Sequence, residues 1–439
     1  MKFYVYAAAA FLAAFALGAG YAVYVAYAAF GAILACRYLA NRWSRSLSAV
    51  RTCRKFTAEV EDTIPIALVI RNAGTMPIVW TLVEDILPPG AFRKHDGRMT
   101  VTGTTLRAMS LRAGERKTLS YQVQFHRRGY YRIGPLLQET GDLLGFYRKC
   151  RVVTEPHYIL VYPKVLTIDG WEVASPRPVG EVRLGCRLFE DPTRIAGVRL
   201  YERGDPLNHI HWKATARTGT LHTRLHDPSS VAGATILLDF GKSSYSPKSE
   251  PYRSELAITA AASVAHAMYE MGHQVGLLTN GVDAASGVAA ADQPGTGEYG
   301  SRDAARTGAE SADAEAIVRP LVVPADKGAG QFMRIWELLA RVELSEGIGL
   351  AETVIHYAGN VARDATVFAI LAEVTPEIAV ALGALRRRGM AVSAVINTYY
   401  DEDFEESAKW LLAEHIEVRH LRDEESVVSL CKDVALSHV

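Results

Sequence analysis

Cysteine is scarce in this chain of 439 residues, and its spacing excludes two kinds of site. The five cysteines are scattered and form no Cys-x-x-Cys pair: Cys36, Cys53, Cys150, Cys186 and Cys431. An odd number at irregular spacing argues against a disulfide framework and against a thiolate zinc site. A reducing compartment fits this usage best.

A surplus of one charge is also lacking. Lysine and arginine together number 48, and so do aspartate and glutamate, so no global field attracts nucleic acid or an acidic substrate. Any charge-driven partner must therefore bind a local patch. Hydrophobic residues make up 49% of the chain. That is enough for two or three domains of about 100 to 200 residues, each with its own core.

Charged residues are missing altogether between Phe3 and Cys36, where apolar residues are interrupted only by glycines. At about 1.5 Å per residue, one straight helix of this length would reach about 50 Å, well beyond the hydrocarbon core of about 30 Å. Two arms of about 16 residues fit better, although each is short for a span. The turn is expected at Gly18-Ala19-Gly20. We therefore predict a transmembrane helical hairpin with its basic flank, residues 1–47, in the lipid bilayer.

The orientation of this hairpin follows from the residues after it. Six basic residues precede the first acid, Glu59: Arg37, Arg42, Arg45, Arg51, Arg54 and Lys55. Positively charged flanks stay in the cytoplasm, so we expect the inner (cytoplasmic) membrane with all soluble domains on the cytoplasmic side. The alternative is a secretory signal, because Lys2, the apolar stretch and the small residues near Gly18 resemble one. A second apolar stretch follows, however, where a signal would have ended.

Residues 48–165 change to short segments with alternating polarity. The run 66–70 is followed by the turn signal Asn72-Ala73-Gly74, and 119–125 alternates with a period of two. This pattern predicts an all-β, immunoglobulin-like sandwich. The segment 127–135, followed by 141–146, combines cations with aromatic rings, a pattern that suits stacked nucleic-acid bases. A closing hairpin with a Gly-Pro turn is the favoured interpretation, so no nucleic acid is expected.

The last part of the chain alternates apolar strands with amphipathic helices. The run 234–239 is apolar and ends in Asp239, which is typical of a buried parallel strand that delivers a carboxylate to its C-terminal edge. Strands and helices then alternate to the end, so residues 234–439 should form a doubly wound α/β domain. Residues 283–330 are rich in small and polar residues, and we expect a flexible, solvated insertion without chemistry.

Residues 166–233 are interpreted as a linker that carries a dense motif. Gly204-Asp205-Pro206 predicts a tight turn. In an extended segment beyond it, Ile210 and Trp212 face one side while His209 and His211 face the other. Lys213 and Arg217 add cations in the same neighbourhood.

This motif resembles the signature of a bacterial family known as domain of unknown function 58, Tyr-x-x-Gly-Asp-x-x-x-x-Ile-x-Trp-Lys-x-x-Ala-Arg. The matching positions, with the histidine inside the pattern, are Tyr201, Gly204, Asp205, Ile210, His211, Trp212, Lys213, Ala216 and Arg217. The resemblance implies a membrane hairpin, a β-sandwich and a von Willebrand factor A-like α/β domain. It also implies a MoxR-type AAA+ ATPase as partner, together with other envelope proteins, in envelope assembly or protein maturation. No biochemical activity comes with it, so the expected role is a non-enzymatic adaptor without catalytic residues.

A von Willebrand-type domain binds Mg²⁺ through Asp-x-Ser-x-Ser after its first strand, because hard cations prefer carboxylate and hydroxyl oxygens. Here Asp239 and Ser243 match the ends of that pattern, but Gly241 replaces the middle hydroxyl and Lys242 adds a cation. A later strand ends in Ala372-Glu373-Val374 rather than in an aspartate. No cofactor is therefore expected, and Mg²⁺ at this degenerate site is the alternative. The favoured role for Asp239 is to cap a loop or to pair with Lys242.

The histidines around the motif suggest a second function. His209, His211, His222 and His226 lie within 18 residues, and converging imidazoles bind Zn²⁺. The alternative function is thus a metal-dependent hydrolase centred on His211, with Asp205 or Asp227 assisting. Alternation along an extended chain spreads these rings apart, and no nucleophile elbow is present, so the adaptor is favoured.

Overall fold

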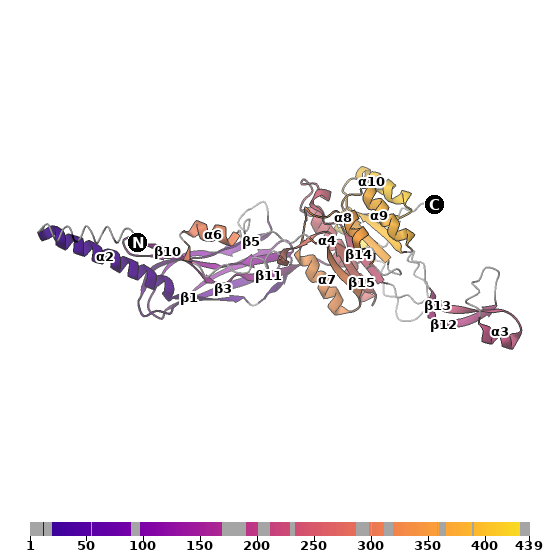
Figure 1. Ribbon diagram of the computed structural model, residues 1–439, viewed down its shortest axis with the longest axis horizontal. Helices are drawn as coiled ribbons and strands as arrows, with labels where there is room; N and C mark the ends of the chain where they lie inside the picture. Colours follow the sequence, from indigo (N-terminus) through magenta and orange to yellow (C-terminus); the bar gives the residue numbers. More distant parts are fainter. Residues whose placement is uncertain are drawn as a thin grey trace. The chain divides into compact units, whose positions relative to one another are not determined.

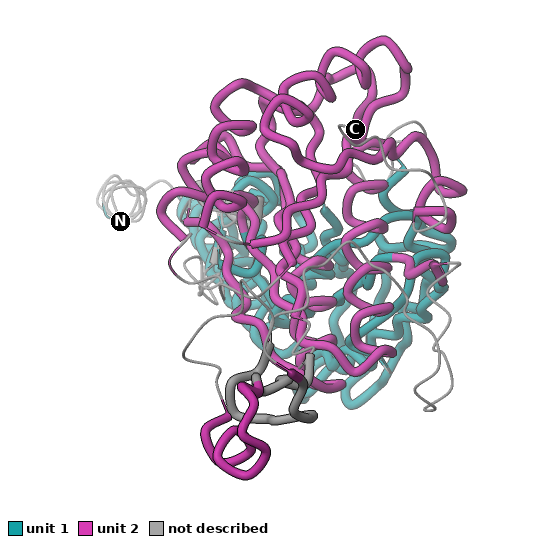
Figure 2. Tube along the Cα trace, turned by 90° about the vertical axis from the view of Figure 1, so that its right-hand side faces the viewer, with its two compact units in different colours: residues 1–163, 283–317 teal, residues 164–282, 318–439 magenta. Residues whose placement is uncertain are grey.

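The computed structural model forms two compact units (Figures 1 and 2). One contains residues 1–163 and 283–317, and the other contains residues 164–282 and 318–439. We call them the β unit and the α/β unit. The structure describes residues 12, 20–53, 55–88, 97–168, 190–200, 211–228, 233–286, 298–299, 301–310, 319–357, 359, 366–388 and 390–430.

The β unit begins with a long apolar helix, α2 (Gly20–Ser46). Within it, Val23–Ser46 is long and apolar enough to cross a membrane. At about 1.5 Å per residue, its 27 residues extend about 40 Å. The second arm was expected to end near Cys36, but the helix continues beyond it through the basic flank. Arginine is a good helix former, and no residue there breaks the helix. The expected first arm lies almost wholly outside the described residues.

Three sheets, mostly antiparallel, form most of the remaining described part of the β unit. Their orders are β1-β3-β7-β5, β17-β10-β9-β4-β6 and β2-β11-β8, with only β2 and β11 running parallel. The strands are β1 (Leu47–Cys53), β2 (Thr57–Glu59), β3 (Thr63–Asn72), β4 (Ile78–Asp85), β5 (Met99–Gly103), β6 (Leu106–Leu111), β7 (Arg116–Phe125), β8 (Gly129–Ile133), β9 (Leu136–Gly141), β10 (Arg148–Thr154), β11 (His157–Tyr162) and β17 (Glu298–Tyr299).

Alternation along β3 and β7 builds the core of this unit, as predicted. Every second residue of β3 is buried, including Ile66 and Leu68, and these pack with Leu119 and Val123 of β7. Trp43, near the end of α2, is buried in the same cluster, so the last turns of the helix belong to the folded unit. The stretch 127–134 is no closing hairpin: β8 pairs with β11, and the turn at Gly134 leads into β9, which belongs to another sheet.

The α/β unit is built on a sheet in the order β18-β15-β14-β20-β21-β22, parallel except for β18 at one edge. Its strands are β14 (Gly233–Leu238), β15 (Gln274–Thr279), β18 (Leu321–Asp326), β20 (Thr366–Leu371), β21 (Ala391–Ile396) and β22 (Glu417–His420). Its helices are α4 (Tyr252–Glu270), α7 (Ala329–Arg341), α8 (Leu350–Tyr357), α9 (Pro376–Arg387), α10 (Asp401–Ala413) and α11 (Glu424–Ser429). A short pair, β16 (Val282–Asp283) and β19 (Val342–Glu343), completes it.

Helices cover both faces of this sheet, which confirms the predicted α/β alternation. Ile236 and Leu238 of β14 pack in one core with α4 and α7, whereas Leu237 between them packs in the other with α8, α9 and α10. Opposite burial of successive residues is expected when a strand is covered on both sides.

Two expectations about the connecting segments were wrong. The start of the supposed linker belongs to the α/β core, because Ile168 is buried and the Leu166 amide donates to Ser263 Oγ at 2.9 Å. The supposed flexible insertion 283–330 contains β17, the helix α6 (Arg302–Glu310) and the sheet strand β18. Low hydrophobicity misled the prediction for β17 and α6, which dock through a few residues each. The apolar run 321–323 was missed as the start of a strand that pairs with β15.

Candidate functional site

The C-terminal edge of β14 places Asp239 beside the end of β15. Asp239 is fully buried, and its Oδ1 accepts hydrogen bonds from the Gly241 amide and from Asn280 Nδ2, both at 3.2 Å. Asn280 also accepts from the Phe240 amide at 2.7 Å, so the side chains of Asp239 and Asn280 join the two loops. Asp239 Oδ2 has no hydrogen-bond partner within the described part of the chain.

Burial dominates the electrostatics of this carboxyl. Desolvation raises the pKa of Asp239, and hydrogen bonds from Ser244, Gly241 and Asn280 oppose that rise. The nearby charge of Glu373 raises the pKa further. The hydroxyl that lowers the pKa of Asp239 is that of Ser244, whereas the predicted Ser243 is exposed. The carboxyl is held closer to its protonated form than an ordinary aspartate.

The groups that meet Asp239 Oδ1 are N–H donors from Gly241 and Asn280, which do not offer a hard divalent cation the oxygens that it prefers. In the described ranges, no three His, Cys, Asp or Glu side chains gather into a group that could hold a metal. A Cβ at Gly241 would lie 3.1 Å from Asn280 Nδ2, so this loop position, where the Asp-x-Ser-x-Ser pattern has its middle serine, fits glycine closely. The ammonium of Lys242 pairs with exposed Glu346 and not with Asp239. Asp239 Oδ1 instead accepts from the Gly241 amide, two residues further along the loop.

The signature motif forms a second candidate site, and half of it is described. Tyr201, Gly204, Asp205 and Ile210 lie outside the described residues. The rest forms a helix, α3 (Trp212–Thr218), between the antiparallel strands β12 (Glu190–Leu200) and β13 (His222–Pro228).

Local capping explains why this segment is helical where an extended strand was expected. His211 Nδ1 accepts from the Ala214 amide at 3.0 Å at the N-terminus of α3. Gly219 ends the helix in the left-handed conformation, with φ of 74°, and its amide donates to the Thr215 carbonyl. One imidazole nitrogen of His211 is therefore already used, and His222 Nδ1 lies 2.7 Å from the Thr220 carbonyl. His209 and the side chain of His226 lie outside what the structure describes.

The helix α3 turns its motif residues to solvent. No residue of α3 is buried, and Trp212 is 66% exposed. Lys213 and Arg217, four positions apart, share one helix face next to the indole, and Ala216 is exposed beside them. Sequence reasoning missed Leu200 and Leu221, which are also exposed at the strand ends that flank α3. Together they form what we call the signature surface: Leu200, Trp212, Lys213, Arg217 and Leu221.

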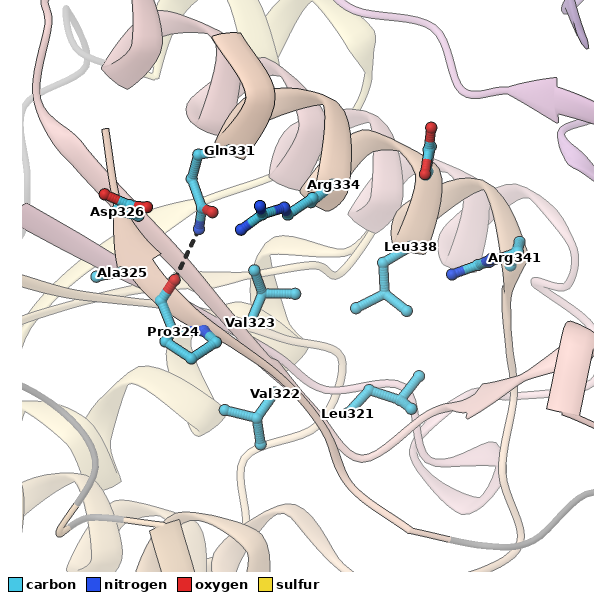
Figure 3. Close-up of a pocket in the computed structure, with 11 residues that line it drawn as sticks. Leu321, Val322, Val323, Pro324, Ala325, Asp326, Gln331, Arg334, Leu338 and Arg341 are labelled. Carbon is cyan, nitrogen blue, oxygen red and sulfur yellow. Dashed lines mark hydrogen bonds between the residues drawn. The ribbon is translucent and has the colours of Figure 1, made fainter. Parts of the chain in front are cut away.

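A cavity of about 480 Å³ lies elsewhere in the α/β unit, between β18 and α7 (Figure 3). Gln331 reaches across it and donates from Nε2 to the carbonyls of Pro324 and Val275, at 2.7 and 2.8 Å. Arg334 and Arg341 line the same wall. None of the residues predicted for function lines this cavity, and Gln331 uses its donors to close the irregular pairing of β18 with β15.

Comparison with known proteins singles out the same region. The family model "Protein of unknown function DUF58" matches residues 197–292, which include α3, β14 and Asp239. The uncharacterized protein YeaD of Bacillus subtilis (strain 168) is 24% identical over 243 residues, covering 54% of this chain and 56% of YeaD. The chain therefore spans about half the length of this curated relative.

Similar solved structures cover smaller parts. The CARDB domain of the PF1109 protein from Pyrococcus furiosus has 15% identity and a TM-score of 0.17, covering 26% of this chain and 91% of that chain. Proximal thread matrix protein 1 from the mussel byssus has 10% identity and a TM-score of 0.25, covering 46% of each chain. At these TM-scores the likenesses carry no argument about fold or function.

Proposed function

We propose that this chain, which belongs to the DUF58 family, is a membrane-tethered, non-enzymatic scaffold that binds protein partners through its signature surface. The proposal extends to an immunoglobulin-like β unit and a von Willebrand factor A-like α/β unit. It also places the anchor in the inner membrane and both units in the cytoplasm, in line with the basic flank that follows the apolar run.

The observation that carries the proposal is the exposure of Trp212 on a helix that buries nothing. A seven-residue helix is too short to be stable by itself, and packing of an apolar face normally holds such a helix in place. Tryptophan and arginine are enriched where protein partners bind, and here the exposed indole lies on the same short helix as two cations. The signature surface therefore has the composition of a binding site for another protein.

The proposed partner is a MoxR-type AAA+ ATPase, acting with other envelope proteins in envelope assembly or protein maturation. Family resemblance supports this partner, and Lys213 and Arg217 make an acidic partner surface complementary to α3. The hydrolase centred on His211 has no comparable support, because that imidazole caps α3.

Co-purification tests the proposal directly. The detergent-solubilised full chain is used to recover cytosolic ATPases, with and without ATP. The variant Trp212→Ala should lose most of the recovered ATPase, because truncating an aromatic anchor costs about 2 kcal/mol or more. Trp410→Ala is the matched control, since Trp410 is also exposed but lies on α10. Equal recovery by both variants, or no ATPase with the parent chain, contradicts the proposal.

A further inference from the structure

Two elements of the segment 283–317 pack against the β unit although both of its ends continue into the α/β unit. These elements are β17 and the helix α6, and together we call them the strap. The chain leaves the α/β unit after Val282, contributes the strap to the β unit, and returns at Val318. The only other crossing between the units is at Pro163.

The strap docks first as a strand. Tyr299 lies opposite Cys150 and Glu298 opposite Arg151, so β17 extends the sheet edge at β10 in antiparallel register. The Tyr299 side chain packs against a small cluster formed by Ile86, Leu137 and Val152. Undocking would expose this cluster and the hydrogen-bonding edge of β10.

The strap docks secondly through charge. Arg302 and Arg306, one helical turn apart on α6, both pair with Glu84 of β4. The Glu84 side chain is only 10% exposed, whereas the two arginines are 29% and 40% exposed. Removing the arginines would leave a nearly buried carboxylate without its partners, a costly arrangement.

These contacts are so few that the strap can detach from the rest of the β unit. The strand pairing involves two residues, and α6 has only nine, so α6 has little helical stability without the surface of the β unit. Strap docking and strap folding should therefore occur together, as one local cooperative unit of low stability.

We propose that the strap is a releasable latch between the two units. Docked, it adds a non-covalent connection to the covalent one at Pro163 and covers the apolar cluster beneath Tyr299. Released, it leaves residues 1–163 joined to the α/β unit through the chain at Pro163 alone and opens the β10 edge. The surface that the strap covers, formed by the edge of β10, the apolar cluster and Glu84, fits a short strand with an aromatic residue, followed by two arginines four positions apart. This inference does not depend on the proposed function.

Cys150 provides a native probe of the latch. It is 3% exposed opposite Tyr299, and burial raises the pKa of its thiol, so a maleimide should modify it only after the strap opens. The experiment uses the solubilised full chain with the other four cysteines replaced by serine. The double variant Arg302→Gln/Arg306→Gln should raise the labelling rate about tenfold to a hundredfold, because charged hydrogen bonds to a buried group are lost.

Matched variants make the result decisive. Glu84→Gln should accelerate labelling similarly, whereas Glu61→Gln, at an exposed carboxylate of the same unit, should leave the rate unchanged. The double variant changes only partly exposed strap residues, so its effect remains interpretable if Glu84→Gln fails to fold. Labelling that is fast in the parent, or equal in parent and double variant, overturns the latch.

A disulfide shows whether the strap docks within one chain. Directly opposed residues of antiparallel strands have Cα atoms about 4.5 to 5.5 Å apart, which suits a disulfide. In the same background, Tyr299→Cys should therefore cross-link to Cys150 on mild oxidation and remain a monomer on a non-reducing gel. Covalent dimers would show that the strap docks on another copy, and absence of the cross-link would show that it does not dock, so either result overturns the proposal.

Discussion

Arg51 and Asp85 form a buried ion pair in the β unit, with only 1% and 0% of their side chains exposed. Arg51 Nη1 also donates to the carbonyls of Ile133 and Glu155, both at 3.0 Å, and Tyr121 donates to Asp85 Oδ2 at 2.5 Å. The pair thus ties β1 to β4, β7 and β8. The sequence analysis counted Arg51 only among the basic residues after the apolar run and did not single out Asp85.

Asp85→Ala should destabilise the β unit by about 3 to 5 kcal/mol, because it leaves the Arg51 charge buried without a partner. Hydrogen exchange of β4 and β7, followed by mass spectrometry on the full chain, measures this loss. Lys55→Met removes an exposed pair with Asp62 in the same unit and should leave exchange nearly unchanged. Equal protection in the two variants would mean that the buried pair contributes little.

Gly134→Ala should destabilise the same network through the backbone. Gly134 has φ of 92°, and a Cβ there would collide with the Arg51 guanidinium. Gly114 also has a positive φ, of 75°, but a Cβ there meets open space. We expect Gly114→Ala to cost about 1 kcal/mol and Gly134→Ala clearly more, as measured by urea denaturation. Similar costs at both positions would contradict the packing argument.

Asp239→Asn should stabilise the α/β unit at neutral pH. Burial raises the pKa of Asp239 above its ordinary value, so the folded state holds this proton more tightly than the unfolded state. The resulting stability is fully present below the unfolded pKa and is lost as pH rises through the folded pKa. Asparagine keeps Oδ1 for Gly241 and Asn280 and has no charge to desolvate.

Thermal unfolding measured from pH 4 to pH 8 tests whether Asp239→Asn becomes more stabilising as the pH rises. The advantage of Asp239→Asn over the parent should be small at the acid end and grow toward pH 8. Asp401→Asn, at an exposed carboxyl of the same unit, is the control. An advantage that shrinks with rising pH would show that the Asp239 carboxylate is stabilised in the fold.

Magnesium should not stabilise the protein through Asp239. A bound ligand at one hundred times its dissociation constant adds about 2.7 kcal/mol, which shifts thermal unfolding measurably. We expect the same small response to MgCl₂ in the parent and in Asp239→Asn. A shift present only in the parent would establish a metal site and reverse our interpretation of this edge.

Charge reversal on α3 should slow partner binding. Lys213→Glu/Arg217→Glu replaces two cations on the signature surface, so association with an acidic partner should become slower, and the difference should shrink at high salt. Lys248→Glu, at an exposed lysine of the α/β unit, controls for net charge. Surface plasmon resonance with the recovered ATPase measures the association rate. An unchanged rate would show that Lys213 and Arg217 do not belong to the binding site.

Local sequence patterns predicted the secondary structure correctly wherever the burial of a residue follows from its neighbours in the sequence. The uncharged run before Cys36 predicted the apolar helix α2, the period of two predicted strands such as β3 and β7, and the apolar run before Asp239 predicted β14. Periodicity reports which face of an element is buried, and that is decided over a few residues.

The sequence by itself determined the order of the chain: an apolar helix, then alternating strands, then strands and helices in turn. Tertiary structure alone decided which distant residues meet. Glu84 receives Arg302 and Arg306 across more than two hundred positions, and Arg51 finds Asp85 on another strand. The physical reason is that burial of a charge is stable only with its partner in place, and no local pattern encodes where that partner comes from.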